Sequence, residues 1–135
     1  MKPLAINPQT LAVPRGYSNG MLFPSGGELL FVAGQVGWDR DGAFAEGLTA
    51  QFELALRNVL DVVRAAGGSP ESIGRLTIYV VDRHDYVAKV KEIGVAYRGL
   101  MGKHFPAMAL VQVAALLEPR ALVEIEATAV IRRAP

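Results

Sequence analysis

Apolar residues recur along the chain at regular spacings, and glycine and proline residues separate the regular segments. The clearest segment, from Thr49 to Ala66, predicts an amphipathic helix because its apolar positions are three and four residues apart. These positions are Phe52, Leu56, Val59, Val63 and Ala66. We expect Thr49 to be the N-cap and Gly67-Gly68 to end the helix, since glycine readily takes the left-handed conformation that follows many helices.

A second segment with helical spacing begins at about His84. Its apolar face consists of Tyr86, Val90, Ile93, Tyr97 and Leu100. Gly94 lies inside this segment, where glycine weakens a helix without excluding it. We therefore predict a second helix that runs from about His84 through Leu100.

The other apolar segments have the alternation and the β-branched composition of strands. The segment MLFPSGGELLFVA predicts two short strands around the turn Ser25-Gly26-Gly27, the second of them at about residues 28–33. Further strands are predicted in RLTIYVV, at about 107–114 and at about 122–131. The order β-β-α-β-α-β-β indicates one α+β domain, residues 1–135, with two helices on one face of a mixed sheet. Solvent or another subunit must cover the other face.

The composition narrows the class of protein. Of the 135 residues 51% are hydrophobic, yet no apolar run reaches the roughly 18 residues of a membrane span. Excess apolar surface without such a span favours an oligomer. The net charge is +1, which argues against a surface for nucleic acid. The absence of cysteine excludes thiolate chemistry and disulfides. The N-terminus MKPLAINPQT does not have the pattern of a secretory signal, so we expect a cytoplasmic protein.

Two carboxylates lie in the last predicted strand, LVEIEATAVI. Side chains alternate between the faces of a strand, so Glu124, Glu126 and Thr128 share one face, and the carboxylates are about 7 Å apart. That spacing suits acid and base roles around a water molecule, and it also suits a hydrated sheet face. In the preceding strand Met108 and Leu110 share a face, where Met108 is either a core or interface residue or a contact for an apolar ligand.

No other pattern in the sequence indicates a catalytic or cofactor site. His84 and His104 are not clustered with carboxylates, so we expect no metal site. None of the serines at 18, 25, 69 and 72 lies in a nucleophile elbow. The glycine-rich stretches lack the spacing and the lysine of a phosphate-binding loop.

Several stretches together resemble the Rid family, also called YjgF or L-PSP. They are GYSNG, LFVAGQVGWD, QFELALRNVLDVVRAAGG, TIYVVD, HFPA and ALVEIEATAV, in the family's order from about Pro14 to Arg133. The resemblance implies a homotrimer of the chorismate-mutase-like α+β fold (bacillus type), with small-molecule clefts between subunits. It also implies the hydrolysis of reactive enamines or imines to ammonia and a 2-oxo acid, without a metal or an organic cofactor.

Residue by residue, the resemblance is partial. It implies that Tyr17 is the pocket tyrosine and that Glu124 is the glutamate that positions water. The arginine that clamps the substrate carboxylate is replaced by Met108, and the serine before GQ is replaced by Ala33. The family's asparagine on the second helix falls on Val90 or Lys91.

The predicted substrate pocket extends beyond these positions. It consists of Tyr17, Ala33, Gly34, Trp38, Met108 and Leu110, near Glu124. Trp38 is either a wall of the cleft or an ordinary packing residue. Arg120, in the loop LLEPRAL, is a candidate substitute for the missing clamp. Glu126 faces the cleft, the trimer axis or solvent.

Three functional hypotheses follow. The first is an enamine or imine hydrolase whose substrate lacks the usual carboxylate, because methionine cannot pair with an anion. The second is a non-catalytic protein that binds or senses a metabolite in the same cleft. The third, a ribonuclease or translation inhibitor, conflicts with the near-neutral charge, since neutralising a phosphate backbone requires several basic contacts.

Overall fold

The computed structural model describes residues 2–24 and 26–132 of the chain. Its elements are β1 (Leu4–Ile6), β2 (Gly20–Leu22), β3 (Glu28–Val36), α1 (Leu48–Ala65), the 3-10 turn η1 (Pro70–Ser72), β4 (Ile73–Val80), α2 (Arg83–Ala88), α3 (Val90–Met101), β5 (Ala107–Gln112) and β6 (Val123–Ile131). Four strands form one sheet in the order β3-β6-β4-β5, and β1 pairs with β2 as a separate ribbon.

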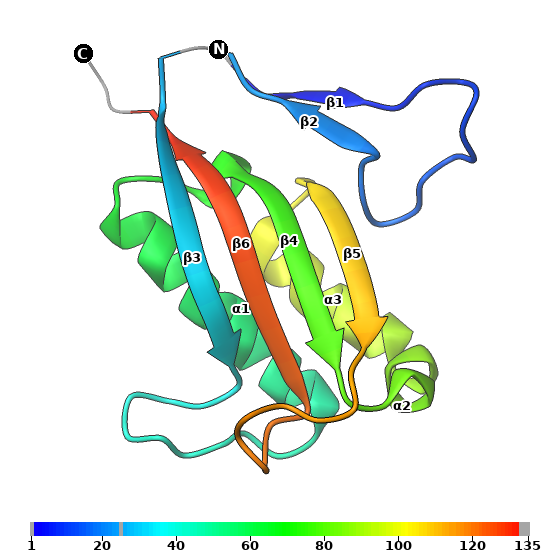
Figure 1. Cartoon of the computed structure of the whole chain (residues 1–135), viewed down its shortest axis with the longest axis vertical. Coiled ribbons are helices and arrows are strands. Elements are labelled where there is room, and N and C mark those ends of the chain that lie inside the picture. The colour runs from blue at the N-terminus through cyan, green and yellow to red at the C-terminus, as the bar shows by residue number, and fades with distance from the viewer. Residues whose placement is uncertain (1, 25, 133–135) are drawn as a thin grey trace.

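The main sheet is mixed and carries its helices on one face. Strands β4 and β5 are parallel, whereas β6 is antiparallel to both β3 and β4. Figure 1 looks onto the sheet, with α1 and α3 behind it and the β1-β2 ribbon beyond one end of the strands. The predicted α+β fold, with two main helices on one face of a mixed sheet, is confirmed.

The core lies between the sheet and α1 and α3. Every second residue of β6 is buried in this layer, namely Val123, Ile125, Ala127, Ala129 and Ile131. They meet the predicted apolar face of α1, on which Phe52, Leu56, Val59 and Val63 are almost fully buried. Burial of each large apolar side chain stabilises the fold by about 1.5–3 kcal/mol. The helices therefore cover the face of the sheet on which the apolar residues of β6 lie.

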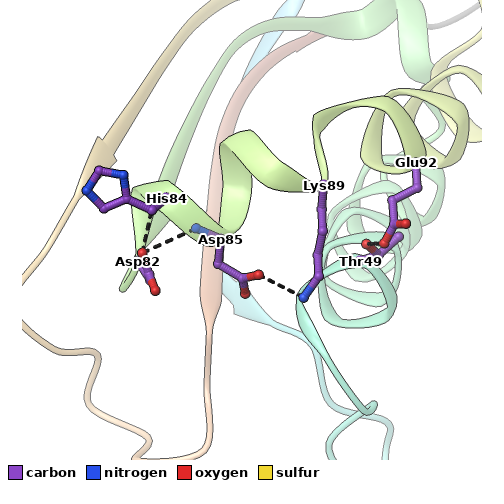
Figure 2. A network of polar contacts seen from close by, with 6 residues as sticks. All are labelled: Thr49, Asp82, His84, Asp85, Lys89 and Glu92. Atoms are coloured by element: carbon purple, nitrogen blue, oxygen red, sulfur yellow. Dashed lines mark hydrogen bonds and ion pairs between the residues drawn. The ribbon is translucent and has the colours of Figure 1, made fainter.

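Helix α1 begins before the predicted position, and Thr49 is not its N-cap. The N-cap is Gly47, whose φ of 83° is a conformation that glycine adopts without strain. Thr49 lies in the first turn, and its hydroxyl donates a hydrogen bond to the carboxylate of Glu92 on α3, as Figure 2 shows. The predicted end of the helix is confirmed, because Gly67 follows it with a φ of 93°.

The predicted second helix is divided into two. Lys89, with φ −109° and ψ 12°, separates α2 from α3. Asp82 caps α2, since its carboxylate accepts hydrogen bonds from the backbone N–H groups of His84 and Asp85 at 2.9 and 3.2 Å (Figure 2). The ammonium of Lys89 pairs with the Asp85 carboxylate at 2.8 Å. The prediction of one continuous helix was wrong because its apolar periodicity continues across the break.

The predicted hairpin around residues 25–27 is not formed. Residues 20–22 pair antiparallel with β1, a strand that the sequence analysis did not predict. The following strand, β3, pairs with β6 instead and continues to Val36, beyond the predicted end at Ala33. Ser25 of the predicted turn lies outside the described residues.

The sheet face opposite the helices exposes large apolar side chains. Leu29 and Phe31 of β3 are 61% and 74% exposed. They pair with Val130 and Thr128 of β6, which alternate with the residues buried under the helices. Val111 of β5 is also exposed. Among the described helices, none combines the length and the hydropathy that a membrane crossing requires.

Candidate ligand pocket

A cavity of about 440 Å³ lies on the helix side of the sheet, between α3, the β4–β5 edge and the segment before β2. Its floor contains three nearly fully buried residues, Phe52, Ile78 and Ile93. Three residues predicted to bind substrate line it together, namely Tyr17, Met108 and Leu110. Val90, one of two candidates for the family's asparagine position, also lines it, whereas Lys91 does not.

Strand register turns Met108 toward this cavity. In the parallel β4–β5 ladder Met108 is paired with Leu76, which is fully buried under the helices. Paired residues of neighbouring strands face the same side of a sheet, so Met108 faces the helices. Leu110, two residues later, faces the same way and pairs with Ile78 of the floor.

Ser18 holds the neighbouring Tyr17 at the pocket. The backbone N–H of Ser18 donates to the carbonyl of Pro106 at 3.0 Å, and its buried hydroxyl donates to the carbonyl of Phe105 at 2.6 Å. These two bonds attach the segment before β2 to the start of β5. Tyr17 is therefore fixed at the rim of the pocket, where 37% of its surface remains exposed.

Two stacked rings form an aromatic wall. Tyr97 of α3 lies parallel to Phe105, with centroids 5.5 Å apart, and its hydroxyl donates to the carbonyl of His104 at 2.7 Å. Burial raises the pKa of Tyr97 and that of Tyr86, which lies on α2. Both phenols are therefore neutral at physiological pH. The stacked pair supplies apolar surface, and Tyr86 also lines the pocket.

Two arginines that the sequence analysis did not propose, Arg15 and Arg98, line the same pocket. Arg98 follows Gly94 by four residues, so the two positions are neighbours on the surface of α3. A Cβ atom at Gly94 would lie 3.2 Å from Nη1 of Arg98, which places the guanidinium above the glycine. Helical spacing from Val90 and Gly94 to Arg98 could have shown this position from the sequence.

Glu124 does not line this pocket. It alternates with the buried Val123 and Ile125, so its side chain is on the sheet face away from the helices, opposite Met108. A Cβ atom at Gly34 would lie 2.4 Å from Oε2 of Glu124. Gly34 thus leaves room for the carboxylate, and the β3–β6 register shift between Val32 and Gln35 falls at Ala33 and Gly34.

Glu126, two residues along the same strand, is engaged by a tyrosine. The hydroxyl of Tyr79 on β4 donates to Oε1 of Glu126 at 2.5 Å. This hydrogen bond, followed by desolvation and the charges of Glu126 and Glu124, raises the pKa of Tyr79. The two carboxylates therefore have different surroundings, and Glu126 serves as a hydrogen-bond acceptor within the sheet.

Trp38 and Arg120 also lie outside the pocket. Trp38 packs against Phe44 with ring centroids 5.4 Å apart, and it borders a separate polar hollow. The guanidinium carbon of Arg120 lies 5.8 Å from the centre of the Phe44 ring. Within one chain Arg120 does not substitute for an arginine at position 108. Among the described residues, no group of three or more His, Asp or Glu side chains is placed to hold a metal ion.

The chain matches known proteins over most of its length. The family model described as Endoribonuclease L-PSP matches residues 8–131. The 2-iminobutanoate/2-iminopropanoate deaminase of Salmonella typhimurium is 35% identical over 111 residues, which cover 78% of this chain and 82% of that protein. RutC family protein PH0854 of Pyrococcus horikoshii is 34% identical over 76% of this chain and 79% of its own.

Solved structures show the same similarity. The conserved Rid family protein YyfB of Yersinia pestis, described as of unknown function, has a TM-score of 0.82 and 36% identity, and the match covers 97% of this chain and 100% of that one. Escherichia coli TdcF, solved with bound serine, has a TM-score of 0.69 and 30% identity, over 91% of each chain.

Proposed function

Because this chain belongs to the Endoribonuclease L-PSP family, the Rid family to which the sequence was assigned by resemblance, we propose that it is an enamine or imine hydrolase of altered specificity. The observation that carries the proposal is the single cavity lined by Tyr17, Met108 and Leu110. Its volume lies within the roughly 300–1,000 Å³ of small-molecule pockets, and its walls are mostly apolar. Relatives named as deaminases of 2-iminobutanoate and 2-iminopropanoate support this class of reaction.

In the proposed reaction, water adds its oxygen to the carbon of the C=N bond. The adduct then loses ammonia, and a C=O bond forms in place of C=N. Glu124 accepts a proton from the attacking water and returns it to the departing nitrogen, as a carboxylate general base does. Tyr17 contacts the bound molecule, and no metal or organic cofactor takes part.

The separation of Glu124 from Met108 supports an oligomeric site. In one chain these residues face opposite sides of the sheet. A Glu124 near the pocket must therefore come from a second copy, which agrees with the exposed apolar residues Leu29 and Phe31 on the uncovered face. We propose a homotrimer with the reaction sites between its subunits.

Met108 changes which molecules this site retains. A bidentate pair between arginine and a carboxylate contributes about 1.5–3 kcal/mol, or roughly ten- to a hundredfold in affinity. Methionine offers a polarisable apolar surface and cannot form this pair. Short 2-imino acids, whose carboxylate is attached to the reacting carbon, therefore lose the contact that would hold them at position 108.

Ammonia release from freshly generated 2-iminopropanoate tests this specificity. We expect the unmodified protein to release ammonia no faster than buffer does, and Met108→Arg to gain measurable turnover. Met108→Leu is the matched control, since it preserves the apolar volume without adding a cation. Rapid release by the unmodified protein, equal to that of Met108→Arg, would show that the absence of arginine at 108 does not set the specificity.

One observation favours a second candidate, a protein that binds a metabolite without converting it. Among the described residues that line the pocket none is acidic, so one chain alone supplies no carboxylate base. The isosteric variant Glu124→Gln separates the two functions. A hydrolase loses turnover while its binding persists, whereas a binding protein shows the same binding and no reaction with either residue.

A further inference from the structure

The part of the pocket rim that one chain supplies carries positive charge, and no described lining residue of that chain balances it. Arg15, in the segment before β2, and Arg98, on α3, both line the cavity, and both side chains are exposed at its open end. The described lining residues include no aspartate or glutamate. Within the described part of the chain, neither guanidinium takes part in an ion pair.

The acidic residues nearest in sequence to Arg98 are already engaged elsewhere. Figure 2 shows the carboxylate of Glu92 with the hydroxyl of Thr49, and that of Asp85 with the ammonium of Lys89. Glu92 is therefore bound to Thr49 of α1, and Asp85 is bound to Lys89 at the end of α2, so neither carboxylate is paired with Arg98. An unpaired guanidinium beside apolar surface favours an anion, because a charge-assisted bond is stronger where water is partly excluded.

The guanidinium of Arg98 lies close to Gly94, one helical turn earlier in α3. A Cβ atom there would come within 3.2 Å of Nη1 of Arg98, which is tighter than an ordinary contact. The guanidinium of Arg98 therefore lies beside Gly94, on the face of α3 that lines the pocket.

The volume of the pocket exceeds what a short imino acid fills. 2-Iminopropanoate has about six non-hydrogen atoms, and even at the roughly 30 Å³ that a water molecule occupies in the liquid it needs less than about 200 Å³. The cavity holds about 440 Å³, and its buried floor is made of Phe52, Ile78 and Ile93. The remaining space suits an aromatic or large aliphatic group.

We propose that the pocket binds a monoanion with a large apolar body, whose carboxylate is held at the rim by Arg98 and Arg15. The apolar body then points inward, against Met108 and the floor. This orientation reverses the one that an arginine at position 108 would impose, because the charge lies at the open end. The inference rests on the proposed function for the identity of the site, and it adds the substrate class: an imine or enamine with an anionic group and an apolar body at opposite ends.

Three small probes separate charge from apolar volume. Phenylacetate has both, phenylacetamide has the same ring without the charge, and acetate has the charge without the ring. We expect calorimetry on the intact protein to show phenylacetate binding at least about tenfold more tightly than either of the others. Equal binding of phenylacetate and phenylacetamide, or no binding of phenylacetate, would overturn the proposal.

Substitution of Arg98 identifies the cation. Arg98→Gln should weaken phenylacetate about tenfold and leave phenylacetamide unchanged, and adding Arg15→Gln should remove the remaining preference for the anion. Arg64→Gln is the matched control, since Arg64 is the basic residue in the last turn of α1 as Arg98 is in that of α3. If Arg98→Gln and Arg64→Gln bind phenylacetate equally, Arg98 is not the anion site.

The readout also separates this inference from the proposed function. Binding of the probes requires no turnover, so a protein that never releases ammonia can still show the charge preference. Conversely, an active hydrolase that binds phenylacetate and its amide equally would support the proposed function, and it would show that Arg98 and Arg15 do not hold an anion at the rim. Thermal unfolding of each variant confirms that a lost preference does not reflect a lost fold.

Discussion

Gln51 binds three backbone groups in two loop segments from a buried position in α1. Its Nε2 donates to the carbonyls of Ala45 and Arg120 at 3.2 and 3.1 Å, and its Oε1 accepts from the N–H of Leu122 at 2.8 Å. Only 3% of the residue is exposed. The sequence did not show this role, because the partners are backbone groups and two of them are about 70 residues away in the chain.

Gln51→Leu should therefore destabilise the fold by about 3 kcal/mol. Leucine fills a similar volume but leaves three partly buried backbone groups without these partners, and each unpaired buried group costs about 1–3 kcal/mol. Urea unfolding followed by circular dichroism measures the change. Gln112→Leu is the control, since its one hydrogen bond, from the N–H of Arg83, is exposed and should cost about 1 kcal/mol or less. Equal destabilisation of both variants would contradict this account of Gln51.

Also at the scale of residues, the sequence predicted some of the pocket and missed its charges. Tyr17 and Met108 were identified by resemblance and lie in one cavity. The resemblance assigns no role to Arg15 or Arg98, and the sequence pattern indicated Arg120 as the candidate for the missing cation. Helical spacing places Arg98 on the same face of α3 as Val90, and the fold shows that this face borders the same cavity as Met108.

At the scale of elements, periodicity predicted the burial of α1 and β6 but not the break between α2 and α3. The apolar residues of α2 and α3 keep helical spacing, so nothing in their pattern marks Lys89 as the interruption. The β1 strand was missed because three residues are too few for an alternating pattern. For the same reason the sequence did not predict that residues 20–22 pair with β1, which lies earlier in the chain.

The cap of α2 provides a test at this scale. Asp82→Ala removes an acceptor from two N–H groups and should destabilise the fold by about 1 kcal/mol. Loss of the cap should let α2 open more often, so we also expect its amide hydrogens to exchange faster in the variant than in the unmodified protein, while exchange in α1 stays the same. The effect would reach the pocket, because α2 carries Tyr86 of its lining. Asp82→Asn, which keeps a capping oxygen, should restore most of the loss. No change in α2 exchange for Asp82→Ala would show that α2 does not depend on this cap.

At the scale of the whole molecule, the two sheet faces divide the predicted site. The helix side holds the pocket, and the uncovered side holds Glu124 together with the exposed Leu29 and Phe31. Alternation along β6 predicted correctly which residues share a face with Glu124. It could not relate that face to Met108, because the relative orientation of two strands depends on their register in the sheet. If one site needs both residues, assembly is part of catalysis.

Phe31→Glu tests that dependence. Phe31 is 74% exposed on the uncovered face, and its burial between subunits would contribute about 1.5–3 kcal/mol per copy, whereas a buried unpaired carboxylate opposes association. We expect light scattering to show trimers for the unmodified protein and monomers for Phe31→Glu. The variant should lose turnover of imines that have a large apolar body and keep its helical circular dichroism. Val95→Glu, at an exposed valine of α3, should leave both assembly and turnover unchanged. A Phe31→Glu protein that remains trimeric would show that this face is not the interface, and a fully active monomer would show that one chain contains the entire site.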